Sequence, residues 1–494
     1  MGLVTPVDPV GLSELGRVHF IGIGGAGMSG IARIMLARGV AVSGSDSAGS
    51  DMLAGLAALG ARVHVGHAAA NLGDADTIVV STAIRESNPE LAEARRRGLR
   101  VLHRAAALAS VMLGQRGIAV AGTHGKTTST SMLTTVLREC GADPSYVIGG
   151  ILAGTGLGAD EGSGDIFVAE ADESDGSFLM LSPEAAIVTC VEADHLDNYP
   201  GLAEIEAAFA AFTRRIRPGG LLVTCADDPG AAALAAAVRA AAPQAVASGA
   251  LPIRVRSYGE SADADYRVSG VVTRGMAISL DVTGSADGPL GNEGLFKNGG
   301  VRVDLRVPGR HNALNAAAVF ALAAELGFPA GQIASGLAAY RGALRRLELK
   351  GEADGVRVLD SYAHHPTEVT ADLRAARDIA EGGRVIVVFQ PHLFSRTRIF
   401  ATALGEALGL ADEVLVLDVY AAREDPEPGV SGELVASRVP GGRARYLPDP
   451  AGVAGAVAAI GKPGDLVLTM GAGDVTALGP LIVAALHARA GAGG

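Results

Sequence analysis

The sequence predicts an α/β protein of three domains, and three observations support this prediction. Strand-like runs rich in valine, leucine and isoleucine alternate with helical stretches along most of the chain, which is the pattern of parallel βαβ units. A length of 494 residues suits three domains, since one domain usually takes about 100–200 residues. With 4 % aromatic residues and no tryptophan, small aliphatic side chains must fill the cores, as in layers of helix packed on sheet.

The first predicted domain, residues 1–112, contains the strand-like runs VHFIGIG, VAVSGSD, DTIVVST and RVLHR. The pattern Gly22-x-Gly24-x-x-Gly27 opens a helix after the first run, and Asp46 ends the second run, as in a Rossmann dinucleotide fingerprint. Such glycines either admit a diphosphate to the helix N-terminus or only allow a close helix–strand crossing. We favour the diphosphate, carried by a nucleotide-linked substrate and not by a nicotinamide cofactor, because a separate ATP loop follows.

The second predicted domain, residues 113–337, begins with a phosphate-binding loop. Residues 118–130 read IAVAGTHGKTTST, a β-branched run followed by the loop and by a helix-forming stretch. Backbone N–H groups of such a loop point at phosphate oxygens, while Lys126 supplies charge and Thr127 a magnesium ligand. Val120 stands where the full Walker pattern has its first glycine. The context nevertheless predicts that the chain binds and spends ATP.

Polar residues end three further runs of this domain, DIFVAEAD, AAIVTCVEAD and GLLVTCADD. Ligands collect at the carboxyl ends of parallel strands, so Glu170–Asp175 and Asp194–Asp197 are candidate site residues. Mg²⁺ prefers oxygen ligands, which Thr127 and a carboxylate can provide. From spacing alone, His195 is equally a metal ligand or an orienting hydrogen-bond donor. The acidic residues at 172, 173 and 175 are open to a second interpretation, as solvated or capping residues.

The rest of the chain predicts a β excursion and a third domain. Residues 253–308 read as short strands with an exposed Gly-rich loop, DGPLGNEGLFKNGG, and the helical run HNALNAAAVFALAAELG closes the second domain. Pro329–Leu347 includes the link to the third domain, residues 338–494. There VRVLDSYAHH, RVIVVFQPH, EVLVLDVY and DLVLTMGAGD alternate with helices, which predicts a Rossmann-like parallel sheet. The terminal run VTALGPLIVAALHARA predicts a docked amphipathic helix.

Composition and charge narrow the class of protein. A net charge of −12 and a pI of 5.4 argue against a nucleic-acid-binding surface. Cys140, Cys190 and Cys225 form no CxxC pair, which fits thiols in a reducing compartment. No basic residue precedes Arg17, and glycine or charge interrupts the longest apolar stretches. We therefore expect a cytoplasmic protein without membrane insertion.

An ordered series of motifs resembles the bacterial cell-wall Mur ligases. The motifs are GIGGAGMSGIA, GTHGKTTST, EADESDGSF, EADHLDNYPG, PGRHNALNAAA, YAHHPTE, FQPHLFSRT and GAGD. They cover almost the whole chain. The resemblance implies a Rossmann-like N-terminal domain for the substrate nucleotide, a central P-loop ATPase domain and a Rossmann-like C-terminal domain on the amino-acid side.

The resemblance also implies a reaction, that of an ADP-forming ligase of peptidoglycan synthesis, and hence of cell-wall biogenesis, cell shape and cell division. In the family's alanine-adding branch, the lactyl carboxylate of UDP-N-acetylmuramate takes the γ-phosphate of ATP, and the amine of L-alanine then displaces phosphate from the acyl phosphate. Mg²⁺ or Mn²⁺ accompanies ATP, and we expect a monomer or weak homodimer. Several sister ligases carry a carbamylated lysine after the DH motif, but residues 196–216 contain no lysine, which favours the alanine-adding branch.

Two alternatives remain open at this point. A murein-tripeptide recycling ligase, which acts on the same UDP-sugar, shares most of the motifs. A nucleotide-dependent switch without ligase activity would need only the phosphate loop and would leave the other two domains without a function.

By resemblance, each matching position has an expected role. The residues expected at the UDP-sugar are Gly24, Gly25, Asp46, His67 and Ser81. Those expected at ATP are Gly122, Thr123, His124, Gly125, Lys126, Thr127, Thr128, Asn312, Asn315 and Arg345. The expected metal ligands are Thr127, Glu170 and His195. Expected to face alanine and the muramoyl end are Tyr362, His364, His392 and Arg396. The expected catalytic residues are Lys126, His195, His364, His392 and Arg396.

Four positions keep a second interpretation or depart from the family pattern. Spacing alone favours a helix N-cap at Asn312 with Asn315 solvated. Ser361 stands where the family usually has an aspartate associated with the ATP ribose, so either Asp360 substitutes or that contact is weaker. Leu347 replaces a common phenylalanine, which we expect to change packing more than chemistry.

Overall fold

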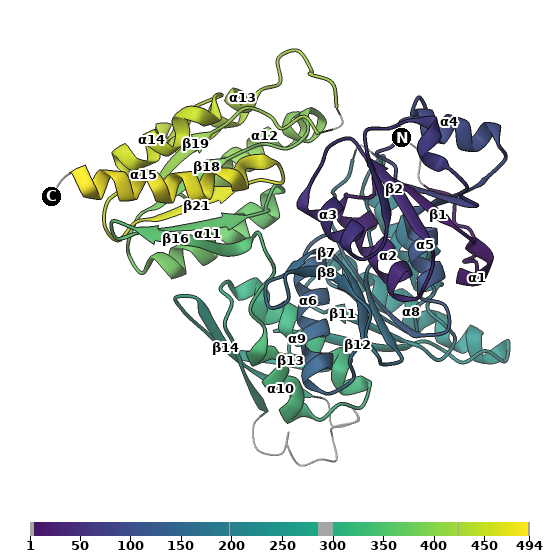
Figure 1. Ribbon diagram of the computed structural model, residues 1–494. Helices are drawn as coiled ribbons and strands as arrows, with labels where there is room; N and C mark the ends of the chain where they lie inside the picture. The colour runs from purple at the N-terminus through teal and green to yellow at the C-terminus, as the bar shows by residue number, and fades with distance from the viewer. Residues whose placement is uncertain (1–3, 197, 285–299, 423, 493–494) are drawn as a thin grey trace. The chain divides into compact units, whose positions relative to one another are not determined.

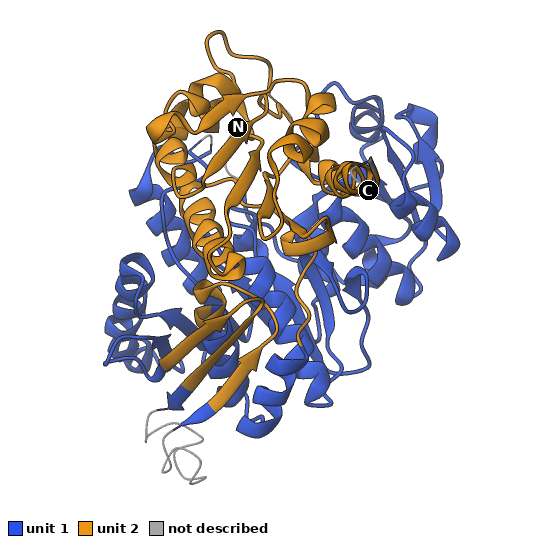
Figure 2. Cartoon of the chain, turned by 90° about the vertical axis from the view of Figure 1, so that its left-hand side faces the viewer, with its two compact units in different colours: residues 1–268, 282–301, 315–339 blue, residues 269–281, 302–314, 340–494 orange. Residues whose placement is uncertain are grey.

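The computed structural model describes residues 4–196, 198–284, 300–422 and 424–492. The strands among them form three sheets of five, ten and six strands (Figure 1). Contacts divide the chain into two compact units (Figure 2). The first unit holds residues 1–268, 282–301 and 315–339, and the second holds residues 269–281, 302–314 and 340–494. The predicted α/β class is confirmed. Of the predicted Gly-rich loop at 287–300, only Gly300 belongs to the described residues.

The five-stranded sheet of the first unit is parallel, with the order β3-β2-β1-β4-β5. Its strands are β1 (Val18–Ile21), β2 (Val42–Asp46), β3 (Arg62–Val65), β4 (Thr77–Val80) and β5 (Arg100–His103). One face packs on α2 (Ala26–Ala37), α3 (Asp51–Ala58) and α5 (Arg104–Val111). The other face packs on α4 (Pro89–Arg96) and the short helix η1 (Ala69–Leu72); α1 spans Leu12–Leu15. The strand order reverses beside β1, where the carboxyl ends of such sheets bind ligands.

The ten-stranded sheet has the order β15-β14-β13-β12-β11-β10-β6-β9-β7-β8. Its strands are β6 (Arg116–Ala121), β7 (Ser145–Leu152), β8 (Leu157–Asp160), β9 (Ile166–Glu170), β10 (Ala185–Val188), β11 (Leu221–Cys225), β12 (Arg254–Gly259), β13 (Tyr266–Arg274), β14 (Ala277–Gly284) and β15 (Val301–Leu305). Neighbours from β12 through β7 pair in parallel, and β7 pairs with β8 antiparallel. The predicted β excursion therefore extends this sheet as β12–β15. Helical elements of the segment are α6 (Lys126–Glu139), η2 (Ser177–Met180), α7 (Leu202–Thr213), α8 (Pro229–Ala247), α9 (Arg310–Glu325) and α10 (Ala330–Ala339).

Helix α6 is rich in hydroxyl residues and yet almost wholly buried. The hydroxyls of Thr130, Thr134 and Thr135 donate to backbone carbonyls four residues earlier, over 2.8, 2.8 and 2.9 Å. These threonines satisfy their own donors, so the helix enters the core with most of its hydroxyl groups paired. Oγ of Ser131 is the exception, since it is buried without a hydrogen bond to the described residues. Helix α10 packs beside it, and a Cβ at Gly336 would lie 2.7 Å from Cα of Val136.

Helix α8 is the one described helix long and apolar enough to cross a membrane, by length and composition only. It is alanine-rich, contains Arg239 and Pro243, and contacts β11 and β12 of the sheet. Arg239 interrupts its apolar run, as the sequence analysis expects of the longest apolar stretches, although the helix as a whole reaches this length. The single helix is weak evidence for a membrane span.

The six-stranded sheet lies in the second unit, with the order β16-β17-β21-β18-β19-β20. Its strands are β16 (Arg346–Ala353), β17 (Val356–Ser361), β18 (Val385–Phe389), β19 (Glu413–Val416), β20 (Ala444–Tyr446) and β21 (Leu466–Met470). Among the strand pairs described for this sheet, β16 and β17 are antiparallel and the others are parallel. The helical elements are α11 (Pro366–Ala380), α12 (Phe394–Leu408), α13 (Gly432–Ala436), α14 (Val453–Ile460), α15 (Leu478–Ala492), η4 (Pro440–Gly442), η5 (Pro450–Gly452) and η6 (Asp474–Ala477). Helices α11 and α12 share one core with the sheet, and α14 and α15 share another. The C-terminal helix docks as expected, through Leu478, Ile482 and Leu486.

Candidate functional site

The phosphate loop joins the central strand β6 to helix α6, as the sequence predicts. Gly122 and Gly125 have φ angles of +130° and +82°, a region that glycine enters at little cost. A Cβ at Gly122 would lie 2.0 Å from Oγ1 of Thr189, so no larger residue fits there. These glycines bring the loop back onto itself so that α6 begins at Lys126 with its N-terminus at the loop, which is the arrangement that binds phosphate.

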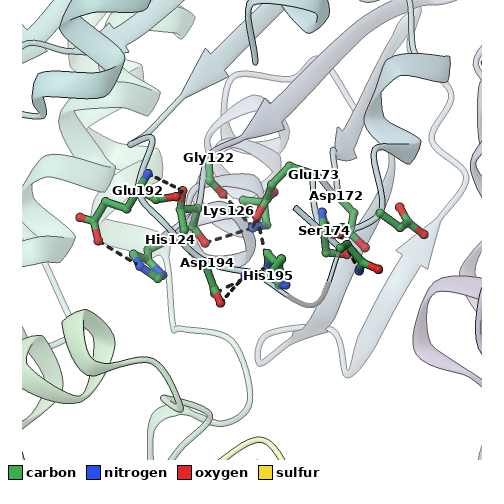
Figure 3. A network of polar contacts seen from close by, with 12 residues as sticks. Gly122, His124, Lys126, Asp172, Glu173, Ser174, Glu192, Asp194 and His195 are labelled. Atoms are coloured by element: carbon green, nitrogen blue, oxygen red, sulfur yellow. Dashed lines mark hydrogen bonds and ion pairs between the residues drawn. The ribbon is translucent and has the colours of Figure 1, made fainter. Parts of the chain in front are cut away.

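Lys126 lies folded against the loop from which it comes (Figure 3). Its Nζ donates to the carbonyl oxygens of Gly122 and Thr123, over 2.7 and 3.2 Å, and to Oε1 of Glu173 over 2.7 Å. Burial by itself lowers the pKa of Lys126, but Glu173 and the neighbouring carboxylates outweigh burial and raise it. The ammonium group is therefore charged and held at the loop, where a phosphate would need it.

Glu170 and Thr127 form the predicted oxygen pair for a metal ion. The hydroxyl of Thr127 donates to Oε1 of Glu170 over 3.1 Å, and the backbone N–H of Gly149 donates to Oε2 over 2.8 Å. Glu170 ends β9 and Thr127 belongs to the first turn of α6. Because β9 pairs in parallel with β6, the strand that leads into α6, the end of β9 and the start of α6 bring these oxygens together. Hydroxyl and carboxylate oxygens are the donors that Mg²⁺ prefers.

His195, in the loop after β10, comes close to Glu173, the carboxylate that binds Lys126. Its Nε2 lies 3.5 Å from Oε1 of Glu173 and 3.7 Å from Oδ2 of Asp194. Its φ of +53° is a left-handed conformation that costs free energy in a non-glycine residue. Burial alone lowers the pKa of His195, but the hydrogen bond to Glu173 and the charge of Asp194 outweigh burial and raise it. The structure thus brings His195 to the Lys126 network, and both interpretations of this residue, as metal ligand or orienting donor, stay predictions.

Glu173 and Asp175 are not solvated, which corrects one alternative from the sequence for these two residues. Glu173 is 2 % exposed, and its Oε2 is buried without a hydrogen bond to the described residues. Asp175 is also buried, and its carboxylate accepts from the backbone N–H of Ser177, where η2 begins. Asp175 is thus a capping residue, as the alternative proposed, whereas Glu173 is not.

Asp172 forms an ion pair with a residue that the sequence did not indicate as its partner. Its Oδ2 lies 2.5 Å from the guanidinium of Arg104, at the start of α5 in the first domain. Burial raises the pKa of Asp172, but the charges of Arg104 and Lys126 outweigh burial and lower it. Arg104 stands 68 positions before Asp172, so no local pattern connects the two. The polar residues that follow β9 therefore bond both to the first domain, through Asp172, and to the phosphate loop, through Glu173.

The remaining loop residues are anchored to the tail of β10. The hydroxyl of Thr123 accepts from the backbone N–H of Glu192 over 2.9 Å, and the backbone N–H of His124 donates to Sγ of Cys190 over 3.2 Å. Thr128 is buried in the first turn of α6. These contacts fix the loop's backbone, which is what a phosphate cradle requires.

The two asparagines of α9 are both 7 % exposed. In the first unit, Oδ1 of Asn315 accepts from the hydroxyl of Ser129 over 3.3 Å. In the second unit, Nδ2 of Asn312 donates to the carbonyl of Pro308 over 2.6 Å. The alternative of a solvated Asn315 was wrong, because this side chain packs beside the phosphate-loop helix. A role at the adenine stays a prediction for both residues.

The residues expected at the UDP-sugar follow strands of the first sheet at their carboxyl ends. The backbone N–H of Gly24 donates to Oδ2 of Asp46 over 2.9 Å, and Gly25 is the N-cap of α2. Nδ1 of His67 lies 2.9 Å from the hydroxyl of Ser45. Ser81 directly follows β4. Because parallel strands share their carboxyl ends, the sheet presents all of these residues along one edge.

The residues expected on the amino-acid side form an aromatic cluster in the second unit. The rings of Tyr362 and His364 are 5.5 Å apart, and those of His364 and His392 are 5.7 Å apart. Tyr420, which the sequence did not single out, stacks on His392 at 5.9 Å. Arg396 is 7 % exposed in the first turn of α12. The sheet therefore gathers these side chains from the ends of β17, β18 and β19.

Arg345 and the pair Asp360–Ser361 also belong to this unit. The guanidinium of Arg345 lies 4.8 Å from the ring of Tyr362 and bonds to Asp360 over 3.2 Å. Asp360 is fully buried and accepts from two threonine hydroxyls as well, both over 2.7 Å. Ser361 donates to Asp372 instead. Asp360 is thus engaged in the core, and its role as a substitute for the family's aspartate stays a prediction.

Leu347, the other departure from the family pattern, is 3 % exposed and belongs to the core beneath α11 and α12. This placement agrees with an effect on packing.

Family models match three consecutive parts of the chain. The model described as Mur ligase family, catalytic domain, matches residues 17–116. The Mur ligase middle domain matches residues 120–323, and the Mur ligase, glutamate ligase domain, matches residues 345–473. Three matched segments agree with the three-domain α/β class predicted from the sequence.

Known proteins resemble the chain over its whole length. A curated UDP-N-acetylmuramate–L-alanine ligase of Thermobifida fusca (strain YX) is 56 % identical, over 98 % of this chain and 100 % of that protein. One of Nocardioides sp. (strain ATCC BAA-499 / JS614) is 54 % identical over the same shares. The crystal structure of the UDP-N-acetylmuramate-alanine ligase of Thermotoga maritima is 28 % identical with a TM-score of 0.77, over 97 % of this chain and 100 % of that one. The structure of a murein peptide ligase from Psychrobacter arcticus 273-4 covers 95 % of this chain and 98 % of its own, at 24 % identity and a TM-score of 0.69, and shows the fold alone.

Proposed function

The chain belongs to the Mur ligase family, and from that premise we propose that it joins L-alanine to UDP-N-acetylmuramate at the expense of ATP. The observation that carries the proposal is the identity of 56 % to a ligase of that name along the full length of both chains. The reaction releases ADP and phosphate and supplies a peptidoglycan precursor, so the protein serves cell-wall biogenesis and, through it, cell shape and division.

The phosphate loop suits the first half of this reaction. In our proposal the γ-phosphate of ATP meets Nζ of Lys126 and the N–H groups of the loop, in place of the carbonyls and the Glu173 carboxylate that now bind Nζ. The lactyl carboxylate attacks this phosphorus, and ADP leaves. Lys126 stabilises the negative charge of the migrating phosphoryl group, which is the main task of a protein in phosphoryl transfer.

A magnesium ion fits the residues beside the loop. Thr127 and Glu170 place a hydroxyl and a carboxylate 3.1 Å apart, and the second oxygen of the buried Glu173 has no hydrogen bond within the described residues. These oxygen donors suit Mg²⁺ or Mn²⁺. We assign the ion to the oxygens of Thr127 and Glu170 and to a ring nitrogen of His195. When bound, such an ion supplies positive charge at the phosphate oxygens.

The second half of the reaction is assigned to the aromatic cluster of the second unit. The carboxylate of L-alanine suits the planar guanidinium of Arg396, which can bind it through two parallel hydrogen bonds. His364 and His392 are placed to donate to the oxyanion that forms when the amine attacks the acyl phosphate. Nδ1 of His364 lies 2.9 Å from the carbonyl of Tyr362, which orients the ring.

The other assignments follow from the family and extend the proposal. The first sheet binds the UDP-sugar at Gly24, Gly25, Asp46, His67 and Ser81, and Asn312, Asn315 and Arg345 contact ATP. The domain limits at residues 112 and 337, a cytoplasmic location without membrane insertion, and a monomer or weak homodimer remain parts of the same proposal. No nucleic-acid partner is assigned, given the net charge of −12.

Phosphate release tests the proposed function. The assay contains ATP, Mg²⁺ and UDP-N-acetylmuramate, and compares L-alanine with the tripeptide L-Ala-γ-D-Glu-meso-diaminopimelate as the amine. We expect release that depends on L-alanine and on the UDP-sugar together. Preference for the tripeptide would make this a recycling ligase, and ATP hydrolysis without either substrate would favour a nucleotide-dependent switch.

A further inference from the structure

A buried carboxylate that the proposed reaction does not use lies at the ligand-binding edge of the first sheet. Glu90, in the first turn of α4, is 0 % exposed. Burial raises the pKa of this carboxyl, but hydrogen bonds from His19, Ser45, Asn71 and Ala68 outweigh burial and lower it to about 2. Burying a carboxylate costs free energy unless each oxygen has a hydrogen-bond partner. We therefore ask which neighbouring side chains the contacts of Glu90 hold in place.

The two oxygens of Glu90 have separate partners. Oε1 accepts from the backbone N–H of Ala68 over 3.1 Å and from Nδ2 of Asn71 over 2.7 Å. Ala68 directly precedes η1 and Asn71 lies within it, so both donors belong to the segment after β3 that carries His67. Oε2 accepts from the hydroxyl of Ser45 over 2.6 Å and lies 3.3 Å from Nε2 of His19. Glu90 therefore connects this segment to β1 and to the end of β2.

The hydroxyl of Ser45 lies between Glu90 and His67, so its bond to Glu90 determines which hydrogen bond it forms with His67. A hydroxyl has a single proton, and Ser45 gives its proton to Glu90. Toward Nδ1 of His67, 2.9 Å away, the same oxygen can only accept. Nδ1 must therefore carry a hydrogen, and in the neutral ring Nε2 must present a lone pair. The ring is 23 % exposed, and Nε2 forms no hydrogen bond with the described residues.

We propose that Glu90 is a positioning residue for the UDP-sugar, which acts through Ser45 to hold His67 in the tautomer that accepts a hydrogen bond at Nε2. Such an acceptor selects an N–H or O–H donor of the uridine nucleotide, namely uracil N3–H or a ribose hydroxyl. It disfavours a phosphate oxygen, because two acceptors would face each other. This inference rests on the proposed function, which places His67 at the UDP-sugar.

Glu90→Gln tests the relay because the amide can adopt only one orientation. Its oxygen must replace Oε1, since two N–H donors, from Ala68 and Asn71, meet that position. Its NH₂ group then faces both the hydroxyl of Ser45 and Nε2 of His19. It donates to the hydroxyl, and His19 must take the tautomer with hydrogen on Nδ1, toward Ser43. Ser45 must turn its proton toward His67, so the ring should switch to the tautomer with hydrogen on Nε2. The substitution thus converts an acceptor at the nucleotide into a donor without a change of shape.

The experiment combines nitrogen NMR of the full-length protein, labelled with ¹⁵N-histidine, with calorimetric binding of UDP. The chain has 11 histidines, and the signal of His67 is identified by its loss in His67→Gln. Spectra are taken at pH 8.5, where an ordinary imidazole is neutral. We expect hydrogen on Nδ1 in the natural protein and in Glu93→Gln, the control on the same helix, whose carboxylate pairs with Arg96. We expect hydrogen on Nε2 in Glu90→Gln, with UDP binding weakened about tenfold.

A second variant keeps the inference testable if Glu90→Gln does not fold. Ser45→Ala removes the hydroxyl between carboxylate and ring, and we expect His67 to lose its single tautomer and UDP binding to weaken by a similar factor. An unchanged His67 tautomer with unchanged UDP affinity, in whichever of these variants folds, would overturn the inference while leaving the proposed function intact. Absence of UDP binding by the natural protein would instead overturn the proposed function. Turnover measurements should place the effect in KM for the UDP-sugar, with KM for ATP and L-alanine unchanged.

Discussion

Nζ of Lys126 lies 2.7 Å from Oε1 of Glu173, inside a loop whose own carbonyls accept the other hydrogen bonds of the ammonium group. We expect Lys126→Ala to reduce phosphate release by at least about a hundredfold, because the migrating phosphoryl group loses its counter-charge. Binding of the UDP-sugar, measured by calorimetry, should be nearly intact, since that ligand belongs to another sheet. Lys462→Ala, at an exposed lysine, is the control. Equal loss of turnover and UDP-sugar binding in Lys126→Ala would contradict this division of labour.

Gly122→Ala should unfold the phosphate loop. The new Cβ would lie 2.0 Å from Oγ1 of Thr189 at a φ of +130°, so both overlap and backbone strain oppose it. We expect the free energy of unfolding in urea to fall by about 3 kcal/mol or more. Gly55→Ala is the matched control, because a Cβ on this residue of α3 meets nothing within 4 Å. There we expect a gain of about 0.5–1 kcal/mol, and similar losses in both variants would refute the role of Thr189.

Glu90 should make the free energy of unfolding decrease as the pH falls into the acidic range. Its pKa is lowered from an ordinary value of 4.5 to about 2 in the folded chain. A carboxyl with a lowered folded pKa contributes stability that is fully present above pH 4.5 and is lost as the pH falls toward 2. A shift of this size corresponds to about 3 kcal/mol. Between pH 6 and pH 3, the free energy of unfolding in urea should therefore fall more steeply for the natural chain than for Glu90→Gln. If the two proteins showed the same dependence on pH, Glu90 would not be an ionised carboxylate in the folded chain.

Arg396→Lys should weaken the recognition of L-alanine. A lysine keeps the charge but loses the two parallel donors of the guanidinium. We expect KM for L-alanine to rise about 10- to 100-fold, while KM for ATP and the UDP-sugar stays unchanged. Arg398→Lys is the control on the same helix, since Arg398 is half-exposed and pairs with Glu427. A rise in all three KM values would show that Arg396 supports the fold and not the amino acid.

The sequence predicted those parts of the site that depend on local order. The phosphate loop and the polar tails of β9 and β10 follow from apolar runs that end in polar residues, and a parallel sheet then brings those ends together. Arg104 and Asp172 could not be paired, because 68 positions separate them and no periodicity relates them. Glu90 was missed for the same reason, since it reads as an ordinary solvated residue in the first turn of a helix. Burial of Asn315 likewise depends on how α9 packs against α6, which spacing along one helix does not reveal.

The burial of helix α6 has a consequence for how phosphate binding responds to ionic strength. Thr127 and Thr128 of its first turn are buried, and Gly125 and Lys126 are half-buried, so protein shields the partial positive charge at its N-terminus from much of the water. Mobile ions screen exposed charges over about 8 Å at physiological salt, but they screen buried ones much less. We therefore expect added salt to weaken ATP binding less than it would if only exposed lysines and arginines attracted the phosphates.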